Sequence, residues 1–317
     1  MNEVAATGAR VVEAVSEAVI GKQTAVRLIL AAALADGHVL IEDLPGLGKT
    51  LLVRSLGQAT GLGHARIQFT PDLMPLDITG STVLDPASRQ AEFRPGPIFA
   101  HLLLADEINR APAKTQAALL EAMQEGQVTV DGVTRTLERP FLVVATQNPI
   151  EYEGTYPLPE AQLDRFLIRV DLGYPQADDE WEMLRSRAER HADEVEVTRV
   201  VDRSEFLRMQ AALEDVFVSE AVGRYIVALV DTTRRHRRVR VGASPRGSLA
   251  LMKMARAMAA LEGRGFVLPD DVQEVAQAAL AHRLIMRPEA WAQGIDEKSV
   301  VGDCLTEVPV PSVAPEG

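Results

Sequence analysis

Cysteine and positive charge are both scarce in this chain. Cys304 is the only cysteine among 317 residues, which excludes an internal disulfide framework and a thiolate metal site and favours a cytoplasmic location. The formal net charge is −12, which argues against a protein that simply coats nucleic acid but does not exclude a local basic groove. The six histidines show no metal-ligand spacing, so no transition-metal site is expected.

Long apolar runs are also missing. The nearest candidate, residues 28–34, is much shorter than the roughly 18 residues that a membrane span needs. The first residues, M-N-E-V-A-A-T, lack the basic region and the apolar core of a secretory signal. The length and the 47% hydrophobic content are sufficient for two globular domains. We expect a cytoplasmic protein without a transmembrane segment.

The stretch 37–50, G-H-V-L-I-E-D-L-P-G-L-G-K-T, predicts a strand, a phosphate-binding loop and a helix. Its glycines allow backbone N–H groups to approach phosphate oxygens, and the helix start adds its positive dipole end. Lys49 would pair with the β- and γ-phosphates, and the Thr50 hydroxyl would hold Mg²⁺. Asp43 departs from the pattern G-x-x-x-x-G-K-[ST], which has glycine there. The alternative is a plain turn between a buried strand and a helix.

Apolar strands and helices alternate up to about residue 175, which predicts an α/β core with a five-stranded, mostly parallel sheet and helices on both faces. Strands are expected at 39–41, 66–69, 101–107, 141–146 and 166–170, and helices at 3–18, 24–35, 49–59 and 112–125. Two hairpins are expected within this core, at about 81–93 with a turn at 85–88, and at about 127–138 around Asp131-Gly132.

After Pro175 the pattern becomes purely helical. The predicted organisation is therefore a core at 1–175, an all-helical domain at 176–290 and a flexible tail at 291–317. Helices are expected near 177–191, 203–214, 219–234, 245–261 and 269–281.

Two acidic residues, Asp106 and Glu107, follow the apolar run 102–105. Asp106 would join the Mg²⁺ shell, and Glu107 would orient and deprotonate a water molecule that attacks the γ-phosphate. The alternative is a pair of helix N-cap residues. Asn148, at the end of the next apolar strand, could hydrogen-bond the γ-phosphate or this water, because ligands bind at the carboxyl ends of parallel strands. Alternatively, Asn148 is a turn former before Pro149.

Several motifs together resemble the MoxR family of AAA+ ATPases, over roughly residues 15–285. They are P-G-L-G-K-T, L-L-A-D-E-I-N-R-A-P-A-K-T-Q-A-A-L-L-E-A-M-Q-E, A-T-Q-N-P, L-P-E-A-Q-L-D-R-F and G-A-S-P-R-G. The resemblance implies an AAA+ core, a helical lid, and ATP or ADP with Mg²⁺ bound where the core meets the lid. It also implies a ring, by family precedent a hexamer.

The resemblance further assigns roles residue by residue. Lys49 and Thr50 match Walker A, Asp106 and Glu107 match Walker B, Asn148 matches sensor 1, Arg165 matches the arginine finger that reaches a neighbouring subunit, and Arg246 matches sensor 2. The loop residues Pro45, Gly46, Leu47, Gly48 and Leu51 would line the nucleotide, and Val19, Ile20 and Gly21 would pack on adenine. The alternatives are a salt bridge of Arg165 with Glu160 or Asp164, a helix-start contact for Arg246, and a simple turn at 19–21.

In this family the two hairpins match the helix-2 insert and the presensor-1 hairpin, which are shared with magnesium-chelatase motor subunits and replicative helicases and point toward the ring centre. The implied work is chaperone-like remodelling, maturation or metal insertion of a client, often with a von Willebrand factor A domain partner. The alternatives are a nucleic-acid-directed motor that uses the arginine run at 234–240, and an assembly scaffold that binds ATP without turnover. Favourable charge at a helix end also accounts for that run. Neither hairpin has the aromatic–hydrophobic–glycine loop of a processive unfoldase.

Overall fold

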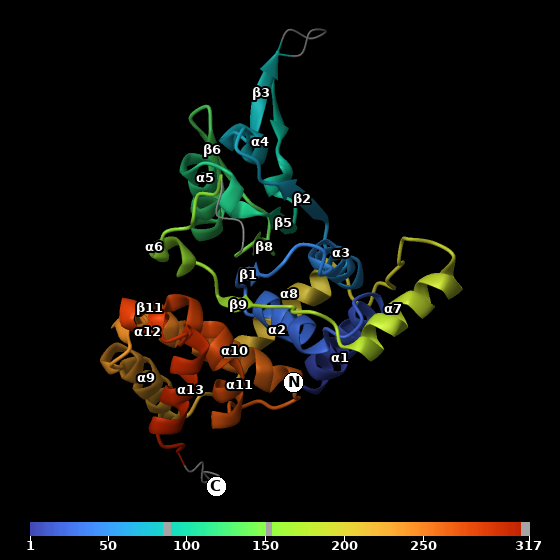
Figure 1. The fold of residues 1–317 in the computed structure, drawn as a ribbon. Coiled ribbons are helices and arrows are strands. Elements are labelled where there is room, and N and C mark those ends of the chain that lie inside the picture. The colour runs from blue at the N-terminus through green and yellow to red at the C-terminus, as the bar shows by residue number, and fades with distance from the viewer. Residues whose placement is uncertain (85–89, 150–153, 312–317) are drawn as a thin grey trace.

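The computed structural model describes residues 1–84, 90–149 and 154–311. Its centre is a five-stranded sheet in the order β2-β5-β8-β1-β9, in which all neighbouring strands are parallel (Figure 1). The strands are β1 Val39–Glu42, β2 His64–Gln68, β5 Leu102–Asp106, β8 Leu142–Gln147 and β9 Ile168–Val170. The predicted α/β core is confirmed, and its sheet is wholly parallel.

Alternate residues along each strand face two separate apolar clusters, as the two-residue period of a strand requires. Leu102 and Leu104 of β5 join one cluster, and Leu103 and Ala105 join the other. The first cluster contains the helices α1 Asn2–Ala18, α2 Gln23–Leu34 and α3 Lys49–Thr60 together with the C-terminal helices. The second contains α5 Ala113–Glu125 and α4 Pro75–Thr79. Helices therefore cover both faces of the sheet.

Two antiparallel hairpins project from the α5 side of the sheet (Figure 1). They are β3 Gly80–Leu84 with β4 Ala91–Pro95, and β6 Gln127–Val130 with β7 Val133–Thr136. The Arg135 guanidinium lies over the Phe93 ring, 3.7 Å from its centroid, so a cation–π contact joins the two hairpins. The predicted turn at 85–88 lies outside the described residues.

The C-terminal part of the chain is mainly helical, as expected. Its main helices are α7 Ala177–Arg190, α8 Arg203–Ala212, α9 Glu220–Arg235, α10 Pro245–Leu261 and α11 Pro269–Leu280. Smaller elements of this part are α12 Pro288–Ala292, β10 Val239–Val241, β11 Ile285–Met286 and the 3₁₀ turns at Leu213–Asp215 and Ala281–Arg283. The core also contains α6 Glu160–Leu163 and the 3₁₀ turns at Pro97–Phe99 and Ile108–Arg110. Among the described residues, no helix is long and apolar enough to cross a membrane.

The expectation of a flexible tail from residue 291 is wrong for its central part. Helix α13 spans Glu297–Glu307, and the Asp296 side chain caps it by accepting from Ser299 N. Val300, Val301 and Cys304 are buried in the first apolar cluster. This helix is short and has only one buried stripe, so the apolar pattern in its sequence is weak, and packing against α9 and α11 stabilises it.

Candidate functional site

The phosphate loop joins the end of β1 to the start of α3. Gly46 and Gly48 both have φ of +84°, a left-handed conformation that favours glycine. The space into which a side chain would project from either residue is open. Nothing therefore covers these two glycines, and the loop leads into the N–H groups of the first turn of α3, an arrangement of the kind that binds phosphate.

Lys49 is buried at this loop, and its Nζ donates to the carbonyl oxygen of Asp43 at 2.5 Å. Burial lowers the pKa of Lys49, and the negative charges of Asp43, Asp106 and Glu107 oppose that shift. The Lys49 ammonium is therefore stabilised by the charges of three carboxylates at the carboxyl ends of β1 and β5.

Asp43, at the position where the pattern has glycine, connects the loop to the segment after β9. Its Oδ2 accepts from the N–H groups of Leu172 and Gly173, both at 2.6 Å, and its Oδ1 accepts from Leu44 N at 2.8 Å. Lys22 Nζ donates to Gly173 O at 2.9 Å and ties the start of α2 to the same segment. The carboxylate thus fixes the path of a loop whose pattern usually depends on a glycine.

Asp106 and Glu107 lie at the carboxyl end of β5 and share the hydroxyl of Thr146. Thr146 Oγ1 donates to Asp106 Oδ1 at 2.6 Å and accepts from Glu107 N at 2.8 Å. Arg66 Nη2 donates to Asp106 Oδ2 at 2.7 Å. Gln68 Nε2 donates to Glu107 Oε2 at 2.8 Å. Strands β2 and β8, on either side of β5, therefore fix both carboxylates.

Asn148 follows β8 directly and is buried. Because β8 pairs in parallel with both β1 and β5, Asn148 lies at the same carboxyl edge of the sheet as Lys49 and Glu107. The Thr50 hydroxyl and the Asp106 carboxylate are oxygen donors only, a set that suits Mg²⁺ bound together with substrate phosphates and water.

The expected adenine segment follows α1. Val19 is buried and Ile20 is half-buried, whereas Gly21 has φ of +75° and lines a cavity of about 480 Å³. Leu172 of the Asp43-bound segment and Ala278 of α11 line the same cavity. Within the described residues, a hollow therefore lies between this segment and the helical part of the chain.

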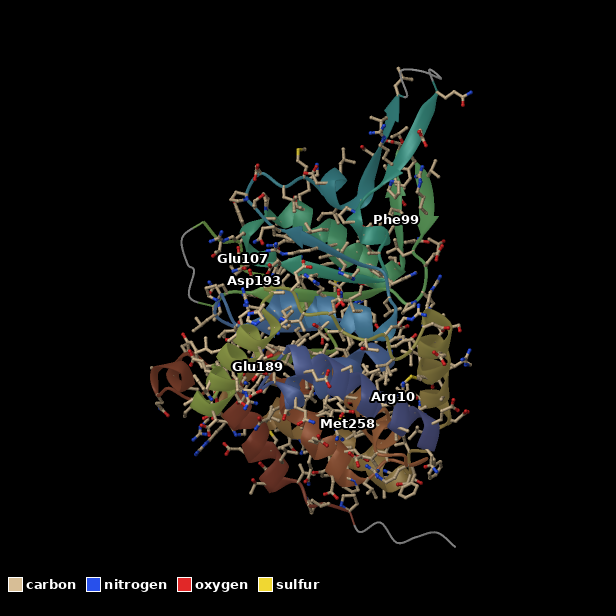
Figure 2. The ribbon with its side chains drawn as sticks, turned by 90° about the vertical axis from the view of Figure 1, so that its right-hand side faces the viewer. Arg10, Phe99, Glu107, Glu189, Asp193 and Met258 are labelled. Atoms are coloured by element: carbon tan, nitrogen blue, oxygen red, sulfur yellow. The ribbon has the colours of Figure 1, made fainter. Side chains whose placement is uncertain are left out.

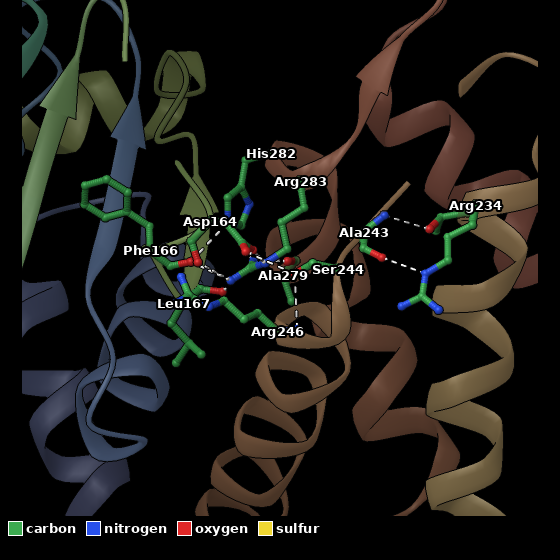
Figure 3. Close-up of polar contacts among 11 residues, drawn as sticks. Asp164, Phe166, Leu167, Arg234, Ala243, Ser244, Arg246, Ala279, His282 and Arg283 are labelled. Carbon is green, nitrogen blue, oxygen red and sulfur yellow. Dashed lines mark hydrogen bonds and ion pairs between the residues drawn. The ribbon is translucent and has the colours of Figure 1, made fainter. Parts of the chain in front are cut away.

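Arg165 and Arg246 are not part of this site. Arg165 precedes β9, and the first residues of β9 pair with the first residues of β1, so Arg165 lies beyond the amino edge of the sheet. Ser244 Oγ donates to Asp164 Oδ2 at 3.0 Å, which places Arg246, two residues further on, beside the Arg165 segment (Figure 3). Helix α2 runs between the two edges, and its 12 residues span about 18 Å.

Arg283 holds the Arg165 segment against the lid (Figure 3). Its Nε donates to Asp164 Oδ1 at 2.9 Å and its Nη2 donates to Phe166 O at 2.7 Å. Burial lowers the pKa of Arg283 to about 10, and Asp164 opposes this shift. Asp164 therefore pairs with Arg283. The sequence had offered a salt bridge of Asp164 with Arg165 as an alternative.

Sequence reasoning missed Gln68, Arg66, Thr146 and Arg283. A signal existed for Gln68, because the predicted strand at 66–69 neighbours β5 and ends at the same edge as Asp106. Thr146, the last residue of a predicted strand, carried a similar signal. Nothing in the sequence pattern indicated the pairing of Arg283 with Asp164, which are 119 residues apart.

Several residues of the arginine run at 234–240 have partners within the lid. Arg234 Nε donates to Ala243 O at 2.9 Å, and Arg238 pairs with Asp303 at 3.0 Å. Arg235 pairs with Asp231 one turn before it. These contacts support a structural role for the run, whereas Arg237 and Arg240 are exposed.

Comparison with known proteins gives two family matches and several similar full-length proteins. The family described as "ATPase family associated with various cellular activities (AAA)" matches residues 38–168, and the "AAA lid domain" matches residues 231–303. "Uncharacterized protein YeaC" of Bacillus subtilis is 48% identical over 95% of this chain and 94% of its own. "Chaperone MoxR1" of Mycobacterium tuberculosis is 41% identical, over 96% and 82%. "Protein MoxR" of Methylorubrum extorquens is 32% identical, over 88% of each.

A crystal structure shows the same fold. It is that of a Cytophaga hutchinsonii protein, described provisionally as an ATPase, with a TM-score of 0.91 and 39% identity. The match covers 98% of this chain and 96% of that protein. The parallel sheet, the hairpins and the helical lid therefore belong to one shared architecture.

Proposed function

Because the chain belongs to the MoxR family of AAA+ ATPases, we propose that it hydrolyses ATP at sites shared between neighbouring copies in a ring. The energy would remodel a partner protein. The observation that supports this proposal is that the residues matching the AAA+ motifs lie at two opposite edges of the sheet. Lys49 and Glu107 lie at the carboxyl edge, whereas Arg165 and Arg246 gather beyond the amino edge.

At the carboxyl edge, the chain's own residues would bind the triphosphate and direct a water molecule. Lys49 exchanges the carbonyl of Asp43 for phosphate oxygens, and the loop N–H groups bind the remaining oxygens. Thr50 and Asp106 would hold Mg²⁺, which neutralises phosphate charge when bound. Glu107 takes a proton from the attacking water as its oxygen bonds to the γ-phosphorus and ADP leaves, and Asn148 orients that water.

Arg165 and Arg246 would complete the site of the next copy. Each guanidinium can bind oxygens of the departing γ-phosphate and stabilise its charge. Because the two arginines lie about the length of α2 away from their own phosphate loop, we propose that both act on a neighbour. A head-to-tail contact of this kind gives a ring when its rotation closes and an open filament otherwise, and we propose a closed ring of six copies.

The client would be contacted by the two projecting hairpins. Leu84 at the end of β3 and Val133 at the start of β7 are exposed, and the Arg135–Phe93 contact joins the two hairpins. We propose that a partner with a von Willebrand factor A domain joins the ring and that remodelling serves maturation or metal insertion of the client. The name of the Mycobacterium tuberculosis relative, a chaperone, supports the coarser part of this proposal.

The test is recovery of ATP turnover on mixing two inactive variants. Lys49→Ala removes phosphate binding but keeps Arg165, and Arg165→Ala does the reverse. We expect each variant alone to be inactive and the mixture to regain turnover, because intact sites form between unlike copies. Arg237→Ala, an exposed arginine outside the site, is the matched control.

Two outcomes would overturn the proposal. Full turnover by Arg165→Ala alone excludes a shared site. Absence of turnover in the parent protein at every concentration, with and without candidate clients, favours a scaffold that binds ATP without hydrolysing it.

A further inference from the structure

Helix α7 carries its apolar side chains on the side that faces solvent. Ala177, Trp181, Leu184 and Ala188 follow one another at spacings of four, three and four residues, so they form one stripe along the helix. All four are exposed, with Trp181 at 64% and Leu184 at 62%. We call this stripe the α7 apolar face.

The opposite side of α7 is polar and less exposed. Its half-buried residues are Asp179, Glu182, Ser186 and Arg190, which lie about half a turn from the apolar face at 100° per residue. A surface helix that packs only on its own chain has the reverse arrangement, with its apolar stripe facing the core. Two large exposed apolar side chains next to each other indicate a surface that another molecule covers.

This helix borders the edge of the sheet that carries the phosphate loop. The Asp179 side chain packs directly on Gly21, so closely that a side chain on Gly21 would collide with it. Glu194, in the segment after α7, pairs with Arg54 of α3 at 3.4 Å. Figure 1 shows α7 projecting from the side of the molecule, and Figure 2 turns this side, with Glu189 on α7, toward the viewer.

Two more exposed apolar residues come from the other edge, where they flank Arg246 in the sequence. Leu249, three residues after Arg246 on α10, is 57% exposed, and Val241 of β10 is 49% exposed. The exposed Arg240 adjoins Val241. We call Val241 and Leu249 the lid apolar pair.

The first turn of α7 and the surface beside the lid apolar pair carry opposite charges, whereas Arg185 and Arg187, further along α7, pair with Glu182 and Asp193. Asp178 and Glu180 are exposed in the first turn of α7, and Arg240 and Arg246 are exposed next to the lid apolar pair. At the start of α2, Lys22 contacts Gly173 in the segment that leads to α7. Just after α2 ends, Gly37 packs on Leu167, in the segment that the lid contacts through Ser244 and Asp164. Within one chain the two surfaces therefore lie at opposite ends of α2. A contact between the two surfaces therefore requires a second copy.

We propose that the α7 apolar face docks on the lid apolar pair of the neighbouring copy in the ring. The proposal rests on the shared site, because a neighbour that places Arg246 at the phosphate loop brings Leu249 to the side where α7 projects. Asp178 and Glu180 then meet Arg240 and the backbone around it. Helix α7 acts as a clamp that orders the arginines of one copy over the nucleotide of the next.

The sharpest test is a disulfide between unlike chains. Cys304→Ala removes the native thiol, and Glu107→Gln keeps ATP bound. One chain then carries Leu184→Cys, and the other carries Leu249→Cys and a size tag. We expect ATP with Mg²⁺ to raise the yield of the tagged–untagged dimer at least tenfold over that of a matched pair with Met183→Cys, which lies on the same helix but off the apolar face.

A second measurement uses Trp181 as a reporter. With Trp291→Phe, Trp181 is the only tryptophan, and its emission should shift to the blue when the ring assembles, because docking removes it from water. Trp181→Glu should raise the concentration needed for assembly at least tenfold, and Met183→Glu should not. An unchanged emission, or a cross-link yield equal to that of the control pair, overturns the proposal.

The two proposals fail in different ways. If the mixture of Lys49→Ala and Arg165→Ala regains turnover but no cross-link forms, the shared site stands and the docking of α7 is wrong. If the cross-link forms and the mixture stays inactive, α7 docks as proposed and the shared site is wrong. A cross-link that forms only within a chain carrying both cysteines excludes the second copy.

Discussion

Asp43 holds its loop with a side chain, at a position where the phosphate-loop pattern uses the freedom of glycine. Its carboxylate accepts three backbone N–H groups from two segments, and such charge-assisted bonds are stronger than neutral ones. Sequence comparison alone suggests that glycine would improve this loop. The contacts indicate the opposite.

We therefore predict that Asp43→Gly weakens both ATP binding and stability. The change leaves the N–H groups of Leu172 and Gly173 without an acceptor, at a cost of about 2–4 kcal/mol. Asp43→Asn should lie between the parent and the glycine variant. Thermal unfolding and nucleotide titration would measure both effects, with Asp215→Asn, an exposed position away from the loop, as control. Tighter ATP binding by Asp43→Gly would contradict the prediction.

Gln68 restrains the residue that is proposed to activate water. It donates to Glu107 Oε2, and Arg110 pairs with the same oxygen at 3.2 Å. We predict that Gln68→Ala leaves Glu107 restrained by Arg110 alone and raises basal ATP turnover severalfold, while ATP affinity stays unchanged. Steady-state kinetics would separate kcat from KM. A fall in kcat would show that Gln68 aligns Glu107 for reaction.

At the scale of single elements, short local signals were predictable and long-range packing was not. The five strands, the Asp131-Gly132 hairpin and the helix after Lys49 follow from apolar runs and turn residues, which act over a few positions. Helix α13 and the Arg283–Asp164 pair depend on segments that are distant in sequence. The outward apolar face of α7 was equally hidden, because a periodic pattern does not reveal which side of a helix is covered.

Helix α13 provides a test of its own docking through Cys304. The thiol is buried beneath the helix, and burial raises its pKa to about 11, so little reactive thiolate forms at neutral pH. We predict that Cys304 reacts with a thiol reagent only as fast as α13 detaches. Val301→Asp, which places a charge in the apolar cluster, should speed the reaction at least tenfold. Leu305→Asp, at a half-buried position, should have a smaller effect. Rapid labelling of the parent protein would show that α13 is not docked.

For the whole molecule, the main feature is that one apolar cluster passes from the sheet into the lid. Val39 and Ile168 of the core belong to the same cluster as Leu251 and Val275 of the lid. The expected boundary near residue 175 therefore separates stretches of sequence, whereas the packing is continuous across it. We predict a single cooperative unfolding transition, detected alike by far-ultraviolet circular dichroism and by scanning calorimetry. Two separated transitions would contradict this.

That continuous packing also buries two histidines that resist protonation. Burial lowers the pKa of His38 and takes that of His282 well below its ordinary value, and Arg283 adds to the shift at His282. The unfolded chain binds protons at these residues near pH 6.5, whereas the native chain binds them only at a lower pH. Stability should therefore be independent of these groups above about pH 7.5 and should fall as the pH drops below 6.5, by at most about 1.4 kcal/mol per pH unit and per histidine. His282 Nε2 lies 3.2 Å from Phe166 O. His282→Gln keeps a donor there and should make this dependence less steep, and the exposed His64→Gln should not. Denaturant unfolding between pH 8 and pH 5.5 would measure the three slopes, and an equal slope in His282→Gln and the parent would show that protonation at the core–lid junction does not limit stability in acid.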